Sequence, residues 1–267
     1  MENFNVSVIL PIESSKHKDF NELFSKSIQS IVNQTVGVNE LVIVHSDEES
    51  LTSIVNEFDY SGLTVTKVVN TGDTDFSSQI NLGVENASSE WITILEFDDE
   101  FASIWFKNVK RYSEAYPDMQ GFLPIVVDID EKGVFAGFTN EATFAASMNS
   151  EIGILTNEVL LNYQNFQSSG MVLKKETYQD FGGFKPSMKL TFVYEFLLRL
   201  TYNSVNIMTI PRLGYKHMNL RFGSIFWNYK NGEERVSEDE VKFWLESAKK
   251  EHFFTNDRGI KYEGIES

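Results

Sequence analysis

Four carboxylates follow directly after an apolar segment in the first half of the chain. Residues 91–95 read WITIL, the composition of a buried strand, and the acids are Glu96, Asp98, Asp99 and Glu100. Burying like charges together is unfavourable unless a cation or several hydrogen-bond donors compensate, so the pattern indicates a metal site. A solvated turn also explains it, because acids favour the N-terminus of a helix, here one expected over residues 102–112.

Composition restricts both the metal and the class of protein. Cysteine is absent, so oxygen and imidazole ligands remain, and these suit Mn²⁺ or Mg²⁺. The 267 residues carry a formal net charge of −16, which argues against nucleic acid as a partner and against anchoring to an anionic membrane by basic residues. The first residues do not resemble a signal peptide, and no apolar run has membrane-spanning length. We therefore expect a cytoplasmic protein with no membrane span.

Apolar runs alternate with helical patterns over the first part of the chain, as in an α/β sheet with parallel strands. Strands are expected at residues 6–10, 41–44, 63–69 and 91–96, and helices at 20–31 and 77–86. Ligands of such open sheets bind beyond the carboxyl ends of the strands. The sequence therefore predicts that three loops converge on one crevice, namely Pro11 to Glu13, His45 to Asp47 and the acids from Glu96.

The second half has a less regular pattern. Residues 133–167 lack a clear period, which predicts loops and edge strands. Four aromatic residues there could stack on the ring of a ligand, although an aromatic side chain more often belongs to the core: Phe135, Phe138, Phe144 and Tyr163. A strand is expected again at 170–173, with helices at 174–181 and 194–199. Ser237 and Glu240 form a capping box that predicts the start of the last helix.

Several short motifs occur in an order that resembles the family 2 glycosyltransferases of the GT-A fold. They are VSVILP at 6–11, SIVNQT at 30–35, ELVIV at 40–44, NLG at 81–83, EFDD at 96–99, GGF at 182–184, LRL at 198–200 and YKH at 215–217. The resemblance implies an α/β fold with a Rossmann-like, mostly parallel central sheet flanked by helices and an irregular acceptor-side half. We expect a GT-A domain over residues 1–225 and a C-terminal helical extension over 226–267 that packs on the same domain.

The resemblance also implies an activity. Such enzymes transfer a sugar from a nucleoside diphosphate sugar, here with a UDP-sugar favoured, to a glycan or other hydroxyl acceptor, usually with inversion and a divalent cation. The cation stabilises the charge that develops on the leaving diphosphate. By this resemblance the metal ligands are Glu96 and Asp98, at the family's Asp-X-Asp motif, and the late histidine His217. A lone histidine would otherwise be a structural hydrogen-bonding residue.

The same resemblance assigns the donor site to loops at the sheet edge. Its expected residues are Pro11, Ile12, Glu13, Asp47, Asn81, Glu96, Phe97 and Arg221. The family's usual paired acids after the second strand are missing, and Asp47 is their replacement. Ordinary explanations exist as well: turn residues in the first loop, close helix packing at Gly83, and a surface position for Arg221.

An inverting transferase needs a carboxylate that accepts the proton of the attacking hydroxyl. The family places this base in a Glu-Asp pair about six residues before the helix arginine, but here those positions hold Phe192 and Val193. Glu195 is the nearest replacement, and Asp99 is the next catalytic candidate. Glu195 is also spaced i, i+4 from Arg199, so the two could form an ion pair on a helix surface.

Two other functions fit parts of the sequence. A catalytically inactive GT-A-like module that binds a sugar nucleotide or a glycan would explain the missing base, although the retained acids and His217 argue against it. A nucleotidyltransferase has a similar core and metal requirement. It would carry a Gly-rich basic loop after the first strand, which residues 11–15 do not provide.

We predict that Mn²⁺ or Mg²⁺ binds together with a nucleoside diphosphate. Ligand bound to the folded state stabilises it by mass action, by about 2–4 kcal/mol at saturating concentration. The melting temperature should therefore be higher with nucleoside diphosphate and Mn²⁺ than with nucleoside diphosphate and chelator, and Asp98→Asn should reduce the difference. Equal melting temperatures in the two conditions would contradict the metal site.

Overall fold

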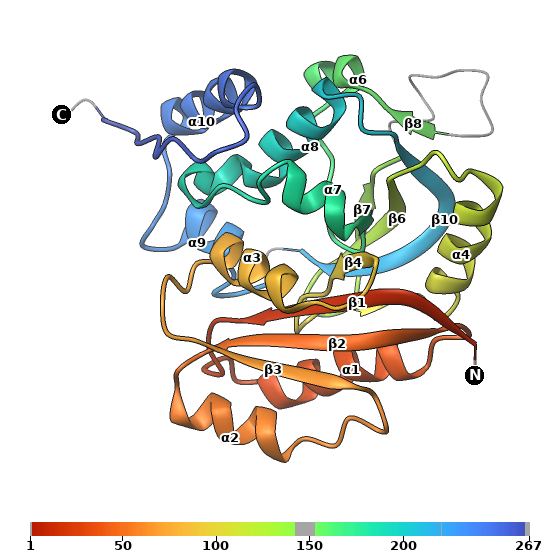
Figure 1. The fold of residues 1–267 in the computed structure, drawn as a ribbon. Coiled ribbons are helices and arrows are strands. Elements are labelled where there is room, and N and C mark those ends of the chain that lie inside the picture. The colour runs from red at the N-terminus through yellow and green to blue at the C-terminus, as the bar shows by residue number, and fades with distance from the viewer. Residues whose placement is uncertain (1, 142–152, 220, 265–267) are drawn as a thin grey trace.

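A computed structural model describes residues 2–141, 153–219 and 221–264, which form a central sheet covered by helices (Figure 1). The strands are β1 (Asn3–Ile12), β2 (Gly37–Ser46), β3 (Val65–Asn70), β4 (Trp91–Ile94), β5 (Glu100–Phe101), β6 (Gly121–Ile129), β7 (Phe135–Thr139), β8 (Gly153–Leu155), β9 (Val172–Lys174) and β10 (Ile207–Met218). The helices are α1 (Phe20–Val32), α2 (Glu49–Glu57), α3 (Phe76–Asn86), α4 (Trp105–Ala115), α6 (Asn157–Asn162), α7 (Lys175–Asp180), α8 (Phe192–Tyr202), α9 (Ile225–Asn231) and α10 (Glu238–Glu251), with a 3-10 helix η1 (Pro186–Thr191).

The strand order is β3-β2-β1-β4-β9-β6-β10-β5, with β7 paired to β6 and β8 paired to β10. Strands β3, β2, β1 and β4 run parallel, as the alternating pattern predicts, and β6 and β10 form a second parallel pair. The short β9 joins the two groups, because it pairs antiparallel with both β4 and β6. The expected α/β class with a mostly parallel central sheet is confirmed.

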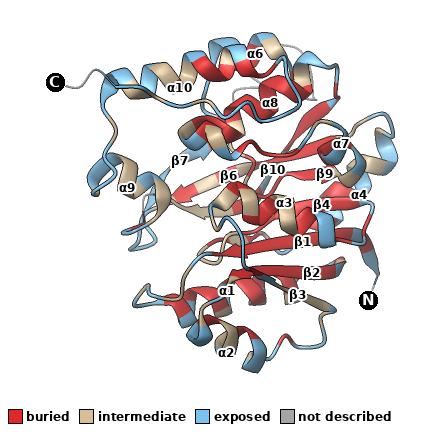
Figure 2. Ribbon diagram, turned by 60° about the vertical axis from the view of Figure 1, so that its left-hand side comes forward, coloured by how far each residue is buried: buried red, intermediate tan, exposed pale blue. Residues whose placement is uncertain are grey.

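Burial explains why the first strands form the centre of the sheet. Leu10 on β1 and Ile43 on β2 are fully buried, and both belong to the core under α1 (Figure 2). Ile9 and Val42, one residue earlier on each strand, belong to a second core under α3 and α8. Side chains of a strand alternate between faces, so a strand covered on both sides is apolar at nearly every position.

The second half differs more from the sequence expectations. Strands β6 and β10 and helix α2 were not predicted, and helix α4 begins at Trp105 rather than at residue 102. Residues 133–167 do contain the edge strands β7 and β8, but also the unpredicted helix α6. Phe144 lies outside the described residues. No helix in the described ranges combines the length and apolar character needed to cross a membrane.

The C-terminal helix α10 packs on α8 and η1 through buried Trp244 and Ala248. The Ser237 hydroxyl accepts a hydrogen bond from the Glu240 N–H at 3.1 Å, which is one half of the predicted capping box. The Glu240 carboxylate accepts from the Trp244 indole at 3.2 Å. The start of this helix is thereby fixed to its buried tryptophan.

A methyl group at Gly83 should disturb the contact between α3 and the sheet. An added Cβ would lie 2.4 Å from Ile9 Cγ2 and 3.0 Å from Val44 Cγ2, inside the buried core. We expect Gly83→Ala to lower the free energy of unfolding by about 1–3 kcal/mol, although alanine favours a helix. Gly137→Ala is the control, since its Cβ would meet no atom within 4 Å. Denaturant unfolding measures both, and equal stabilities would refute the packing argument.

Candidate active site

Strands β5 and β10 bring the acids after β4 to the late histidine. The two strands pair antiparallel, with Phe101 opposite Tyr215 and Glu100 opposite Lys216. The preceding residue Asp99 therefore lies beside the following residue His217, and their side chains meet at 3.0 Å across 118 positions of sequence. The sequence prediction groups His217 with Glu96 and Asp98 as metal ligands and gives Asp99 a catalytic role, so the contact between Asp99 and His217 is a finding of the structure.

Asp99 is fully engaged by hydrogen bonds. One carboxylate oxygen accepts from the Met218 N–H at 2.8 Å, and the other lies 3.0 Å from His217 Nδ1. Burial alone would lower the pKa of His217, but the carboxylates of Asp99, Glu96 and Asp128 together outweigh it and raise the pKa to about 10. Asp99 therefore orients the imidazole and fixes Nδ1, which leaves Nε2 as the nitrogen for a further ligand. This arrangement suits a positioning residue better than a general base.

Glu96 completes a group that fits a cation. Ligand atoms of Glu96, Asp99 and His217 all lie within 4.8 Å of one another. Burial and the neighbouring Asp99 raise the pKa of Glu96 to about 8, which shows that nearby positive charge does not offset the crowding of acids. The Glu96 N–H donates to the Tyr215 hydroxyl at 3.2 Å, so the loop backbone is held on β10. Carboxylate and imidazole ligands of this kind suit Mn²⁺ or Mg²⁺.

Asp98 has a different partner. Arg221 Nε donates to Asp98 Oδ2 at 2.5 Å, and the guanidinium lies over the Phe97 ring at 4.7 Å from its centre. Burial raises the pKa of Asp98, as does Asp99, while Arg221 opposes the increase. Asp98 and Arg221, expected at the metal and the donor phosphates, thus contact each other, and the surface position considered for Arg221 does not occur.

The loops after β1 and β2 also meet, as the crevice prediction requires. The Ser46 hydroxyl donates to the Glu13 carbonyl oxygen at 2.6 Å. Pro11 and Ile12 are buried, whereas Glu13 and Asp47 are exposed at this edge. Their placement is compatible with the donor contacts expected of them.

Asn81 forms hydrogen bonds that the donor-site expectation does not include. Its side-chain nitrogen donates to the Phe184 carbonyl at 2.8 Å, and its oxygen accepts from the Phe184 N–H at 3.0 Å and the Tyr178 hydroxyl at 2.6 Å. Both ends of the amide are therefore used to join α3 to the turn after α7. These bonds give Asn81 a packing role that the sequence did not predict, and because one amide N–H remains available within the described residues, the donor contact stays a prediction.

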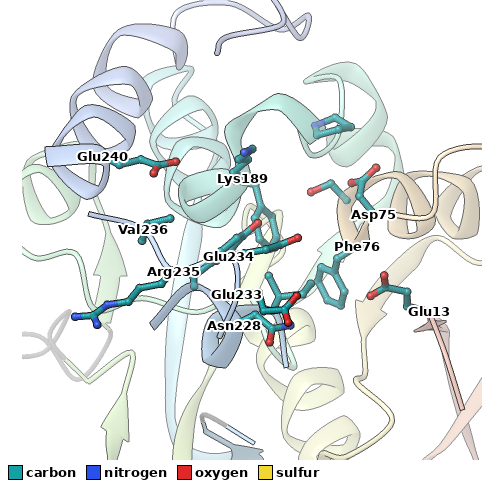
Figure 3. A pocket seen from close by; sticks show the side chains of 15 residues that line it. Glu13, Asp75, Phe76, Lys189, Asn228, Glu233, Glu234, Arg235, Val236 and Glu240 are labelled. Carbon is teal, nitrogen blue, oxygen red and sulfur yellow. The ribbon is translucent and has the colours of Figure 1, made fainter. Parts of the chain in front are cut away.

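A pocket of about 700 Å³ opens next to the β1 loop, and sequence reasoning found only one of its residues, Glu13 (Figure 3). It is lined by Glu13, Asp75, Phe76, Ser77, Pro186, Lys189, Phe192, Ile225, Asn228, Tyr229, Glu233, Glu234, Arg235, Val236 and Glu240. Glu13 and Phe76 lie on one side of it and Glu240 on the other (Figure 3). Four separate segments build this pocket, so no local motif could reveal it.

Glu195 lies in the protein core rather than at the pocket or the acid cluster. Its side chain is 0% exposed, and its two oxygens pair with Lys185 Nζ and Arg199 Nη2, each at 2.8 Å. The i, i+4 pairing with Arg199 is present, but it is buried instead of on a helix surface. An acceptor hydroxyl cannot reach this carboxylate without opening the core, so we no longer place the general base there.

The buried ion pairs also hold the C-terminal segment. Lys185 Nζ donates to the carbonyl oxygens of Glu251 at 2.8 Å and Phe254 at 2.7 Å, and Arg199 Nη1 donates to that of Thr255 at 3.2 Å. Buried charges need several partners, and these carbonyls complete the set. Glu195 therefore stabilises two cations that fasten the end of α10 to the domain.

The comparisons with known proteins concern the family and the fold. A family model described as "Glycosyl transferase family 2" matches residues 15–161. No curated protein matches the chain. Among solved structures, S. aureus TarS 1-349 in complex with UDP is similar at 15% identity and TM-score 0.63, over 94% of this chain and 72% of that chain.

Two further TarS structures are similar in fold. S. aureus TarS 1-349 in complex with UDP-GlcNAc matches at 16% identity and TM-score 0.64, over 92% of this chain and 65% of that one. A structure of S. aureus TarS without that truncation matches at 16% identity and TM-score 0.57, over 96% of this chain but 44% of that one. The present chain thus spans less than half of the longer TarS chain.

Removing the Glu195 charge should destabilise the fold. Glu195→Gln leaves Lys185 and Arg199 buried without their anion, which costs about 3–5 kcal/mol of unfolding free energy. The control is Glu22→Gln, which breaks the exposed i, i+4 pair with Lys26 and should change stability little. Denaturant unfolding gives both values. If Glu195→Gln keeps full stability while transfer falls, the catalytic role of Glu195 is restored.

Proposed function

Because the chain belongs to glycosyl transferase family 2, we propose that it transfers a sugar from a nucleoside diphosphate sugar to an acceptor hydroxyl, with inversion and with a divalent cation. The observation that carries this proposal is the convergence of Glu96, Asp99 and His217 at the carboxyl edge of the sheet, with Asp98 on the same loop. Acids so crowded need positive charge, and a cation there would meet the diphosphate of a donor lying on the same edge.

The residues of this edge would divide the work. Glu96, Asp98 and His217 would hold Mn²⁺ or Mg²⁺, which when bound neutralises charge on the leaving diphosphate. Asp99 keeps the His217 ring in place. A UDP-sugar is the favoured donor, and the TarS structures, whose descriptions name UDP and UDP-GlcNAc, support that choice. Pro11, Ile12 and Asp47 would face the nucleoside.

The general base must come from outside the family's usual position, which is apolar here. Phe192, at that position, lines the pocket, and Glu13 lies on the same pocket. Partial desolvation of the Glu13 carboxyl raises its pKa, and the neighbouring Glu234 and Asp75 carboxylates raise it further. A base works best with a pKa close to the working pH, so we propose Glu13 as the group that accepts the proton of the attacking hydroxyl.

A second candidate function is a binding module without turnover, and the apolar Phe192 and Val193 favour it. Incubation with a panel of nucleotide sugars, in Mn²⁺, Mg²⁺ or chelator, distinguishes the two. We expect metal-dependent release of nucleoside diphosphate from one UDP-sugar, with little release in chelator or in Asp98→Asn. Donor binding in calorimetry without any release would favour the binding module instead.

Replacing Glu13 should remove proton acceptance but keep the pocket shape. We expect Glu13→Gln to lower transfer by roughly 10²- to 10⁴-fold with nearly unchanged donor affinity. The wild-type rate should rise with pH as Glu13 loses its proton at its raised pKa, and the variant should lack that rise. Glu233→Gln, another carboxylate on the same pocket, is the control. If Glu13→Gln is as active as wild type, Glu13 is not the general base, and another acid of the pocket becomes the candidate.

A further inference from the structure

We propose that Arg221 is an internal counter-cation for Asp98 that competes with the divalent cation for this carboxylate and contacts the donor diphosphate once the cation displaces it. The inference rests on the proposed function, because it requires a metal at the acids after β4. The proposal adds that binding of the cation and binding of the donor influence each other through the Arg221 side chain.

The first argument is how firmly the pair is held. The side chains of Asp98 and Arg221 are only 7% and 10% exposed, so water screens their attraction weakly. The guanidinium also lies over the Phe97 ring, and Arg221 Nη1 donates to the Phe222 carbonyl at 3.3 Å. Arg221 is thus positioned by contacts on two faces as well as by the charge of Asp98.

The second argument is the distribution of charge. In the described part of the chain, His217 pairs with Asp99, and Arg221 pairs with Asp98. Glu96 forms no ion pair in that part, although its carboxylate lies close to Asp99 and His217. A divalent cation bound to Asp98 would lie against the guanidinium, and like charges at such close range repel strongly. Binding of a metal to Asp98 and pairing of Asp98 with Arg221 therefore oppose each other.

The third argument is where a displaced guanidinium would go. Arg221 lies just beyond the end of β10, which carries His217, so it stays at the metal site after losing Asp98. A planar guanidinium binds phosphate oxygens through two donors at once. Arg221 should therefore oppose binding of the metal alone but support binding of the nucleoside diphosphate with metal. These opposite signs make the proposal testable.

The experiment measures Mn²⁺ binding from the free-ion electron paramagnetic resonance signal, first without nucleotide. We expect Arg221→Gln to bind Mn²⁺ more tightly than wild type, by roughly 5- to 150-fold, the usual range of such coupling. In saturating Mn²⁺ the same variant should bind UDP more weakly in calorimetry. Arg212→Gln is the control for net charge, because the exposed Arg212 contacts only the Pro211 carbonyl in the described structure and should change neither affinity.

A charge-neutral variant tests the same mechanism independently of net charge and of any misfolding of Arg221→Gln. Phe97→Leu removes the ring beneath the guanidinium, so it should also tighten Mn²⁺ binding, though less. If wild type binds Mn²⁺ and neither Arg221→Gln nor Phe97→Leu binds it more tightly, the proposed competition is wrong. The proposed function is then unaffected. Absence of Mn²⁺ binding in all variants, with and without UDP, overturns both.

Discussion

The fold depends on how negative charge is compensated where β4 ends. Four acids follow an apolar strand there, and burial and crowding raise the pKa of Glu96 and Asp98, so these two must find positive charge or become protonated. Strand β10 supplies it, because it is long enough to pair with β6 along its length and still reach β5. The antiparallel contact with β5 then sets His217 against Asp99. The same pairing of β5 with β10 that completes the sheet therefore also places a positive side chain beside the acids.

Buried negative charge is compensated differently around Glu195. There a buried carboxylate has two cations of its own, Lys185 and Arg199, and backbone carbonyls satisfy the remaining donors. A group whose charge and hydrogen bonds are complete has no need of a ligand. The acids after β4 differ, since the pKa of Glu96 stays raised to about 8 beside its neighbours. This contrast separates a structural ion cluster from a candidate metal site.

The features that could be predicted from the sequence are those set by neighbouring residues, such as the strands of the first half. Strands β1 to β4 follow from apolar runs, and the order of motifs placed the acids after β4 and His217 in one predicted site, although it did not predict the direct contact of Asp99 with His217. The burial of Glu195 could not be predicted, because i, i+4 spacing to Arg199 is the same on a surface and in a core. Its burial depends on Lys185 and on carbonyls beyond residue 250, which no pattern around α8 contains. The packing role of Asn81 could not be predicted for a similar reason, since its partners lie about 100 residues away.

The buried cluster also helps to shape the pocket. The segment between β10 and α10 contributes Tyr229 and Glu234 to the pocket wall. Its first end is fixed by the pair of Arg221 with Asp98, and the helix that follows is fastened through the carbonyls bound by Lys185. A segment held at both ends keeps its position at lower entropic cost than a free one. Helix α8 has apolar residues at the position expected for the general base, but its buried residues Glu195 and Arg199 still support the pocket, because they help to hold the C-terminal segment on the domain.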